Sequence, residues 1–183
     1  MYGRKTWGGP VEPHILVKFL QNTAADGSDP IASMIIFEWS DYDLVGIQPS
    51  GDAEVRPPKD LRCLGHNLIV LQREYICDPE AISNGWCNGN QTGQFLLAEN
   101  ATELSTSLII TQAVHLKNPG LPINYEVKKT GYYCVSTGAY SPADVEYAAI
   151  VEFRNAYGEL PAAQIAKLPF YGGLTIVYTV IGA

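Results

Sequence analysis

The sequence has few of the residue patterns on which metal sites and nucleic-acid surfaces depend. Its four cysteines form no Cys-x-x-Cys pair and its three histidines are scattered, so the ligand spacing of a zinc site is absent. Residues 26–29 and 41–43 offer carboxylates but no twelve-residue calcium loop, and such residues commonly form turns. The net charge is −7 with no Lys/Arg cluster, whereas nucleic acid requires a basic surface. We expect no metal, no cofactor and no nucleic acid.

Motifs for catalysis are also missing. The chain contains neither Gly-x-Ser-x-Gly nor His-Glu-x-x-His, and a nucleophile needs an adjacent base held by a third group. His14 borders an expected strand and His115 lies within another, so both rings are expected to be packed or solvent-facing. Glu146 and Glu152 fall on the polar face of the last strand, where solvated carboxylates are ordinary. We expect a protein that is not an enzyme.

The residues that are abundant favour β-strands. Hydrophobic residues make up 46% of the 183 positions and charged residues only 17%, with 11 Tyr and many Val and Ile. This composition is typical of strands, and the length suits one domain with a tail. Short strand-like segments alternate with turn residues, and almost no amphipathic helix is visible. We therefore expect an all-β fold, an antiparallel β-sandwich of about eight strands over residues 1–154.

Two strand predictions are specific enough to check. Residues 33–39 and 42–48 flank Ser40-Asp41, which indicates a hairpin. In the last strand, residues 145, 147, 149, 151 and 153 are apolar and point one way, whereas Glu146, Glu152 and Arg154 point the other, which predicts one buried and one wet face. Among the aromatic residues, Trp39 and Tyr147 are expected in the core.

Cys77 and Cys87 bracket a short irregular excursion. Residues 79–82 are expected to form one helical turn that Asp78 caps and that Asn84-Gly85 ends. A disulfide between the two cysteines would close a loop of about ten residues and stabilise the fold by roughly 2.5–3 kcal/mol. We favour this pair, which by arithmetic leaves Cys63 and Cys134 as a second one.

Two glycosylation sequons follow this excursion, at Asn90-Gln91-Thr92 and Asn100-Ala101-Thr102. Together with an even number of cysteines they favour an oxidising lumen over the cytosol. Sandwich domains often bind partners through loops, and the aromatic candidates for such contacts are Trp7, Tyr42, Trp86, Tyr133 and Tyr140. Trp86 lies in a turn-rich loop, and we expect it to be a partner contact.

The chain changes character after the last strand. Residues 155–167 form a linker, and residues 168–183 contain no charge. As a helix these sixteen residues would rise roughly 24 Å, less than the roughly 30 Å hydrocarbon core. They are either a buried terminal strand or the start of a transmembrane helix that is cut short, and we favour the helix. Residues 1–7 have no apolar stretch behind their basic pair, so they are no signal peptide and a lumenal domain would need one from elsewhere.

Several segments of the sequence resemble a known family. NAYGELPA at 155–162 followed by KLPFYG at 167–172 is similar to the entry into the first membrane helix of the fungal lung seven-transmembrane receptor proteins, also called GOLD-domain seven-transmembrane proteins. Further similarity lies in MYG at 1–3 with WGG at 7–9, in YICD at 75–78 with Cys87, and in KTGYYCV at 129–135. The resemblance therefore extends from one end of the chain to the other.

This resemblance implies a lumenal GOLD-like β-sandwich, seven membrane helices after it, and a role in membrane trafficking in Golgi or endosomal membranes. The chain departs from the family pattern because it lacks the signal peptide and a cysteine just before the Met-Tyr-Gly segment. It also lacks everything after the first sixteen residues of the first helix. The missing cysteine would be a partner for Cys134 and would leave Cys63 free, which is an equal alternative to a Cys63–Cys134 pair.

The function expected from these features is that of a lumenal, non-catalytic interaction domain of a multi-spanning membrane protein. Its partners would be a lumenal protein or glycan, facing residues 1–167, and the lipid bilayer, entered by residues 168–183. Two alternatives are a secreted lectin-like domain whose apolar tail is its last core strand, and a regulatory cap over a seven-helix channel or transporter.

Overall fold

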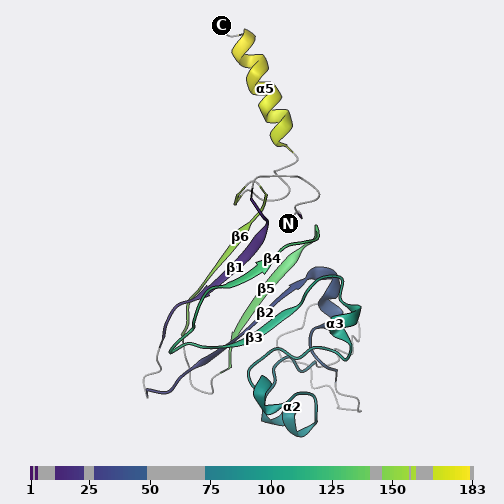
Figure 1. The fold of residues 1–183 in the computed structure, drawn as a ribbon, viewed down its shortest axis with the longest axis vertical. Coiled ribbons are helices and arrows are strands. Elements are labelled where there is room, and N and C mark those ends of the chain that lie inside the picture. Colours follow the sequence, from purple (N-terminus) through teal and green to yellow (C-terminus); the bar gives the residue numbers. More distant parts are fainter. Residues whose placement is uncertain are drawn as a thin grey trace, which may run out of the picture.

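Two three-stranded antiparallel sheets form the body of the molecule (Figure 1). The computed structural model describes residues 1, 3, 11–22, 27–48, 73–140, 146–156, 158–159 and 167–181. One sheet has the order β4-β1-β6 and the other β3-β2-β5. The six strands are β1 (His14–Phe19), β2 (Ile31–Glu38), β3 (Ile110–His115), β4 (Ile123–Glu126), β5 (Tyr133–Ala139) and β6 (Ala149–Arg154). The predicted all-β, antiparallel character is confirmed.

Strand β2 is the most buried element because both of its faces are covered. Its residues from Ala32 to Glu38 are all buried. Met34 and Ile36 belong to the core between the two sheets, whereas Ile35 and Phe37 pack on the opposite face against the segment around Val45. A nearly continuous apolar run is what a strand covered on both faces requires.

The core between the two sheets contains residues of both central strands, β1 and β2. Ile15 and Val17 of β1 pack with Met34, Ile36 and Tyr125. The Tyr125 hydroxyl donates to the carbonyl of Leu108 at 2.7 Å, so this buried polar group is satisfied. Burial of the ring is the main cause of the raised pKa of Tyr125.

The buried face predicted for the last strand is wrong at Val151 and Phe153 of β6, which are exposed although they pair with buried residues of β1. Val151 pairs with Val17 and Phe153 with Ile15, both of which are fully buried. Val151 and Phe153 nevertheless remain 38% exposed, because β6 is an edge strand and has a neighbour on one side only.

The predicted hairpin between residues 33–39 and 42–48 is wrong. Trp39–Leu44 is a 3-10 helix, η1, and the neighbours of β2 are β3 and β5. The Glu38 side chain accepts a hydrogen bond from the backbone N–H of Ser40 at 2.9 Å and caps this turn. Within the described residues, Val45 and Ile47 form only isolated bridges, with Leu97 and Glu74. Some segments expected to be strands therefore form only single bridges. This explains why the described residues contain six strands, whereas the sequence predicts about eight.

The expectation of a core position for Trp39 is also wrong. Its side chain is 58% exposed and stacks on Tyr42, with ring centroids 5.5 Å apart. The 3-10 turn begins at Trp39 and ends the strand geometry of β2. Glu38, the last residue of the strand, is buried, whereas the side chain of Trp39 is exposed. Tyr147 is partly buried against the core, as expected.

Short helices lie on one side of the sandwich and a longer one stands apart from it (Figure 1). The short elements are α2 (Pro79–Ser83), η2 (Gly89–Gln91) and α3 (Ala101–Leu104). Helix α5 (Leu168–Ile181) extends away from the end of the sheets. The tail is thus helical rather than a buried terminal strand. In the part of the chain that the structure describes, no helix has both the length and the apolar character needed to cross a membrane.

Candidate binding site

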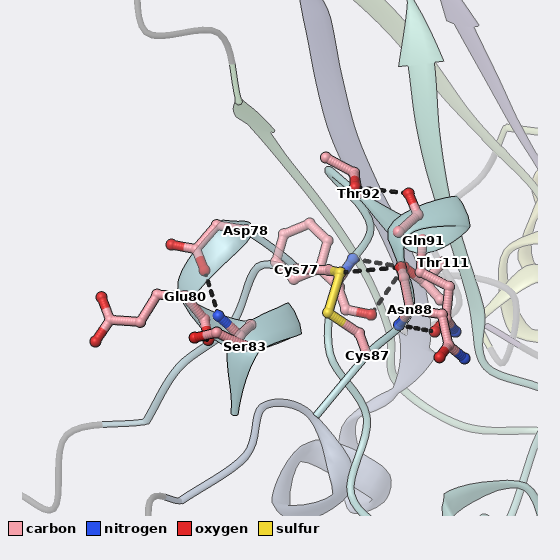
Figure 2. The surroundings of a disulfide bond; sticks show 12 residues. Cys77, Asp78, Glu80, Ser83, Cys87, Asn88, Gln91, Thr92 and Thr111 are labelled. Atoms are coloured by element: carbon pink, nitrogen blue, oxygen red, sulfur yellow. Dashed lines mark hydrogen bonds between the residues drawn. A yellow bond between two sulfur atoms is a disulfide. The ribbon is translucent and has the colours of Figure 1, made fainter. Parts of the chain in front are cut away.

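The most structured loop region is stapled by a disulfide between Cys77 and Cys87 (Figure 2). This is the pair that the sequence favours. Helix α2 lies inside the closed loop, and the Asp78 carboxylate accepts from the backbone N–H of Ala81 at 2.7 Å. The predicted one-turn helix with its Asp78 cap is therefore confirmed. Cys77 is fully buried.

A small apolar cluster surrounds this staple. Cys77, Ala81 and Leu96 are buried together, and Trp86 packs against them. The backbone N–H of Trp86 donates to the carbonyl of Ala81 at 3.0 Å. Because Trp86 precedes the bonded Cys87 and follows a hydrogen-bonded turn, its position is fixed from both sides.

Trp86 forms one wall of a cleft of about 600 Å³. Described residues that line it include Asp43 in η1 and Ile47 after it, Arg73, and Leu97 and Glu99 before α3. The lining therefore combines an aromatic ring and two aliphatic side chains with one guanidinium and two carboxylates. Such a mixture of apolar surface and a few polar groups is typical of small-molecule binding sites.

Arg73 is held in place by backbone carbonyls of the segment around η1. Its Nη1 donates to the carbonyl oxygens of Asp43 at 3.0 Å and Val45 at 3.1 Å. The Asp43 carboxylate lies 3.8 Å from Nη2 and is 90% exposed. A pair this exposed contributes little to stability, so the Asp43 carboxylate is available for other contacts.

Gly46 allows the segment after η1 to pass close to the ring of Tyr75. Its φ is +81°, a left-handed conformation, and a Cβ there would lie 2.8 Å from the ring of Tyr75. Its N–H donates to the carbonyl of Leu96 at 2.9 Å. Only glycine combines this backbone conformation with this contact.

A second group of polar side chains lies at the end of β2. The Asp41 carboxylate accepts from the backbone N–H groups of Thr106 at 2.8 Å and Ser107 at 3.1 Å. Glu38 accepts from the N–H groups of Ser40 and Tyr132. Burial raises the pKa of Glu38, but these hydrogen bonds outweigh burial and hold that pKa below its ordinary value. Both carboxylates serve as structural acceptors, since their oxygens are occupied by the protein itself.

The other aromatic candidates are not gathered at the cleft. Tyr42 is exposed and stacks on Trp39, whereas Tyr133 and Tyr140 are half-buried. Trp7 lies outside the described residues. Asp43, Arg73 and Glu99 were not singled out from the sequence, because they come from separate segments and no local motif connects them.

Both sequon asparagines, Asn90 and Asn100, are exposed. Asn100 has a left-handed backbone with φ 60° at the start of α3 and directly follows the cleft residue Glu99.

Cys134 has a free thiol in the described part of the chain, and burial is the main cause of its raised pKa. Cys63, its alternative partner, lies outside the described residues. Among the described residues, no group of three or more His, Cys, Asp or Glu side chains is placed to hold a metal ion.

The sequence is similar to those of membrane proteins from fungi. Over 191 residues the chain is 29% identical to membrane protein PTM1 of Saccharomyces cerevisiae, covering 98% of this chain and 32% of that protein. It is 31% identical to an uncharacterized membrane protein of Schizosaccharomyces pombe, over 99% of this chain and 34% of that protein. The chain thus spans about a third of the length of these relatives.

No solved structure gives a significant match. A family model described as PTM1-like, N-terminal domain, matches residues 1–57 and 58–155. This match covers the whole sandwich and ends before α5. The chain therefore belongs to the PTM1-like N-terminal domain family.

Proposed function

We propose that this chain is the lumenal interaction domain of a multi-spanning membrane protein that takes part in membrane trafficking. In this proposal the sandwich is GOLD-like, binds a partner without catalysis, and resides in the lumen of the Golgi or of endosomes. Helix α5 begins the first membrane span of a seven-helix protein. The names of the relatives, which are membrane proteins, support this assignment.

The observation that carries the proposal is the surface of α5. The helix contains no charged residue, and its exposed large hydrophobic side chains are Phe170, Tyr171, Leu174, Ile176, Val177, Tyr178, Val180 and Ile181. Apolar surface on all sides of a helix is unfavourable in water and is typical of a helix within a membrane. Its fourteen residues rise roughly 21 Å, about two thirds of the hydrocarbon core.

The polar groups of α5 are also suited to lipid. The hydroxyls of Thr175 and Thr179 donate to the carbonyls of Tyr171 and Thr175, each at 2.8 Å. These bonds satisfy both hydroxyls within the helix, and an unsatisfied polar group in the hydrocarbon region costs several kcal/mol. The two threonines can therefore enter a bilayer with their hydroxyls already paired.

The lumenal side is supported by the disulfide and the sequons. The Cys77–Cys87 bond belongs to an oxidising compartment. Asn90 and Asn100 are both at the surface, where a glycan can be accommodated. A binding role is supported by the cleft, whose lining combines the ring of Trp86 with two carboxylates and one guanidinium among the described residues.

The assignment is tested by glycosylation of the full chain expressed behind a signal peptide. We expect an endoglycosidase to increase the gel mobility in two steps, one for each sequon. Thr92→Ala should remove one step and Thr102→Ala the other, which makes each variant the control for the other. A chain that enters the secretory pathway without any endoglycosidase-sensitive shift contradicts the lumenal assignment.

A further inference from the structure

We propose that the cleft beside Trp86 binds a neutral oligosaccharide. The proposal rests on the lumenal location proposed above, because the glycans of glycoproteins face that compartment. It assigns the apolar face of a sugar to Trp86 and the hydroxyls to Asp43, Arg73 and Glu99, all of which line the same cleft of about 600 Å³.

The lining has the two kinds of surface that a sugar requires. A pyranose ring presents C–H groups on its faces and hydroxyls around its edge. Trp86, Ile47 and Leu97 provide apolar surface, and an indole ring can also donate a hydrogen bond at its rim. The carboxylates accept hydrogen bonds from hydroxyls and the guanidinium donates to them. The volume is within the usual range of ligand sites, about 300–1,000 Å³.

The charge of the cleft excludes an acidic ligand. One arginine faces two carboxylates, and the chain as a whole has a net charge of −7. Arg73 already donates from Nη1 to two backbone carbonyls, so this nitrogen is not free to bind an anion. A phosphate or a sialylated glycan would meet a repulsive field, whereas a neutral sugar would not.

The site is held in its binding geometry before any ligand arrives. Trp86 is fixed by the adjacent Cys77–Cys87 bond and by its hydrogen bond to Ala81. Arg73 is fixed by the carbonyls of Asp43 and Val45. Preorganised side chains lose less conformational freedom on binding, which raises affinity.

Two sources could supply the sugar, and both have the same chemistry. Glu99 lines the cleft and Asn100, the second sequon asparagine, is the next residue, so their Cα atoms are about 3.8 Å apart. A glycan on Asn100 would start at the rim of the cleft. The other source is the glycan of a second glycoprotein.

The test is a titration of the full chain, purified in detergent with its disulfide formed but without glycans. The neutral probes are a free high-mannose oligosaccharide and chitotetraose, and sialyllactose is the anionic comparison. We expect saturable heat and a change in tryptophan fluorescence with a neutral probe, and weaker binding of sialyllactose. Glu99→Gln should weaken binding by about tenfold, the loss expected for a hydrogen bond to a charged group. Trp86→Phe should weaken it as well.

Trp39→Phe is the matched control, because Trp39 is the other tryptophan among the described residues and does not line the cleft. Its binding should equal that of the wild type. Glu99 is exposed, so Glu99→Gln keeps the test decisive even if Trp86→Phe lowers stability. The proposal is overturned if the folded chain binds no neutral probe, if sialyllactose binds more tightly, or if Trp39→Phe weakens binding as much as Glu99→Gln.

The source is distinguished by repeating the titration with chain made in a secretory host. If the Asn100 glycan occupies the cleft, added oligosaccharide binds only after endoglycosidase treatment or in Thr102→Ala. If the ligand belongs to a second glycoprotein, binding is the same with and without treatment. Both results support the site. Failure of sugar binding leaves the gel shift that tests the lumenal assignment unaffected, so the two proposals can fail separately.

Discussion

The carboxylate of Asp41 accepts a hydrogen bond from the backbone N–H of Thr106 at 2.8 Å. This contact ties the 3-10 turn after β2 to the segment that leads into β3, sixty-five residues later in the chain. Asp41 is 2% exposed and also accepts from Ser107. A single buried side chain therefore replaces the strand pairing that a hairpin would have provided at this position.

Replacing Asp41 should strongly destabilise the protein. Asp41→Ala leaves the amides of Thr106 and Ser107 without their acceptor, and each buried unsatisfied group costs about 1–3 kcal/mol. We expect a loss of roughly 2–4 kcal/mol in the free energy of unfolding, measured by urea titration. The control is Asp43→Ala, whose carboxylate is 90% exposed and whose loss should cost under about 0.5 kcal/mol. Equal effects of the two substitutions would show that the Asp41 contacts are unimportant.

Stability should depend on pH through Glu38. Its pKa in the folded protein is lowered from the ordinary 4.5, so its contribution is present above that value and is lost as the pH falls through the folded pKa. We expect the free energy of unfolding to fall below about pH 4.5, measured by urea titration across an acidic series. In Glu38→Gln this part of the fall should disappear. An unchanged pH dependence in the variant would contradict the role of Glu38.

Reduction of the disulfide should loosen the cleft. The Cys77–Cys87 bond closes a ten-residue separation, and its loss should cost roughly 2.5–3 kcal/mol in the chain-entropy treatment. A Cys77→Ser, Cys87→Ser double variant should therefore show a lower Tm, and a reductant should lower the Tm of the wild type in the same way. Cys134→Ser should keep the sensitivity that the Cys77–Cys87 bond confers, because Cys134 takes no part in that bond.

Gly46 is the position where the smallest side chain should be harmful. Ala would adopt a left-handed backbone and its Cβ would lie 2.8 Å from the Tyr75 ring. We expect Gly46→Ala to destabilise the protein by more than about 1 kcal/mol, measured by thermal unfolding. Gly89→Ala is the matched control, because a Cβ there meets nothing within 4 Å. A Gly46→Ala protein as stable as Gly89→Ala would show that the two segments can separate at little cost.

Features that depend on residues close together in the sequence could be predicted. The period-two pattern within residues 145–153 predicts the strand that the structure has as β6, and Asp78 followed by Pro79 predicts the cap and first turn of α2. Each depends on periodicity or on a cap within a few residues, where side-chain chemistry directly selects backbone conformation.

Features that depend on contacts distant in sequence could not be predicted. Residues 42–48 have the composition of a strand, yet Glu38 and Asp41 hold the chain in a 3-10 turn by binding Tyr132 and Thr106. Trp39 is exposed for the same reason. The turn-rich loop around Trp86 predicts a contact residue from the local sequence. Arg73 and Glu99 line the same cleft only because the folded chain brings their segments together.

Co-flotation of the full chain with phospholipid vesicles on a density gradient tests most directly whether α5 enters a bilayer. We expect the wild type to rise with the vesicles, and an Ile176→Lys, Val177→Asp variant to remain in the dense fraction, because charges in the apolar helix oppose insertion. Leu121→Asp, at an exposed residue outside α5, should still float. Flotation of the doubly charged variant together with the wild type, or absence of the wild type from the vesicle fraction, would contradict the membrane role of α5.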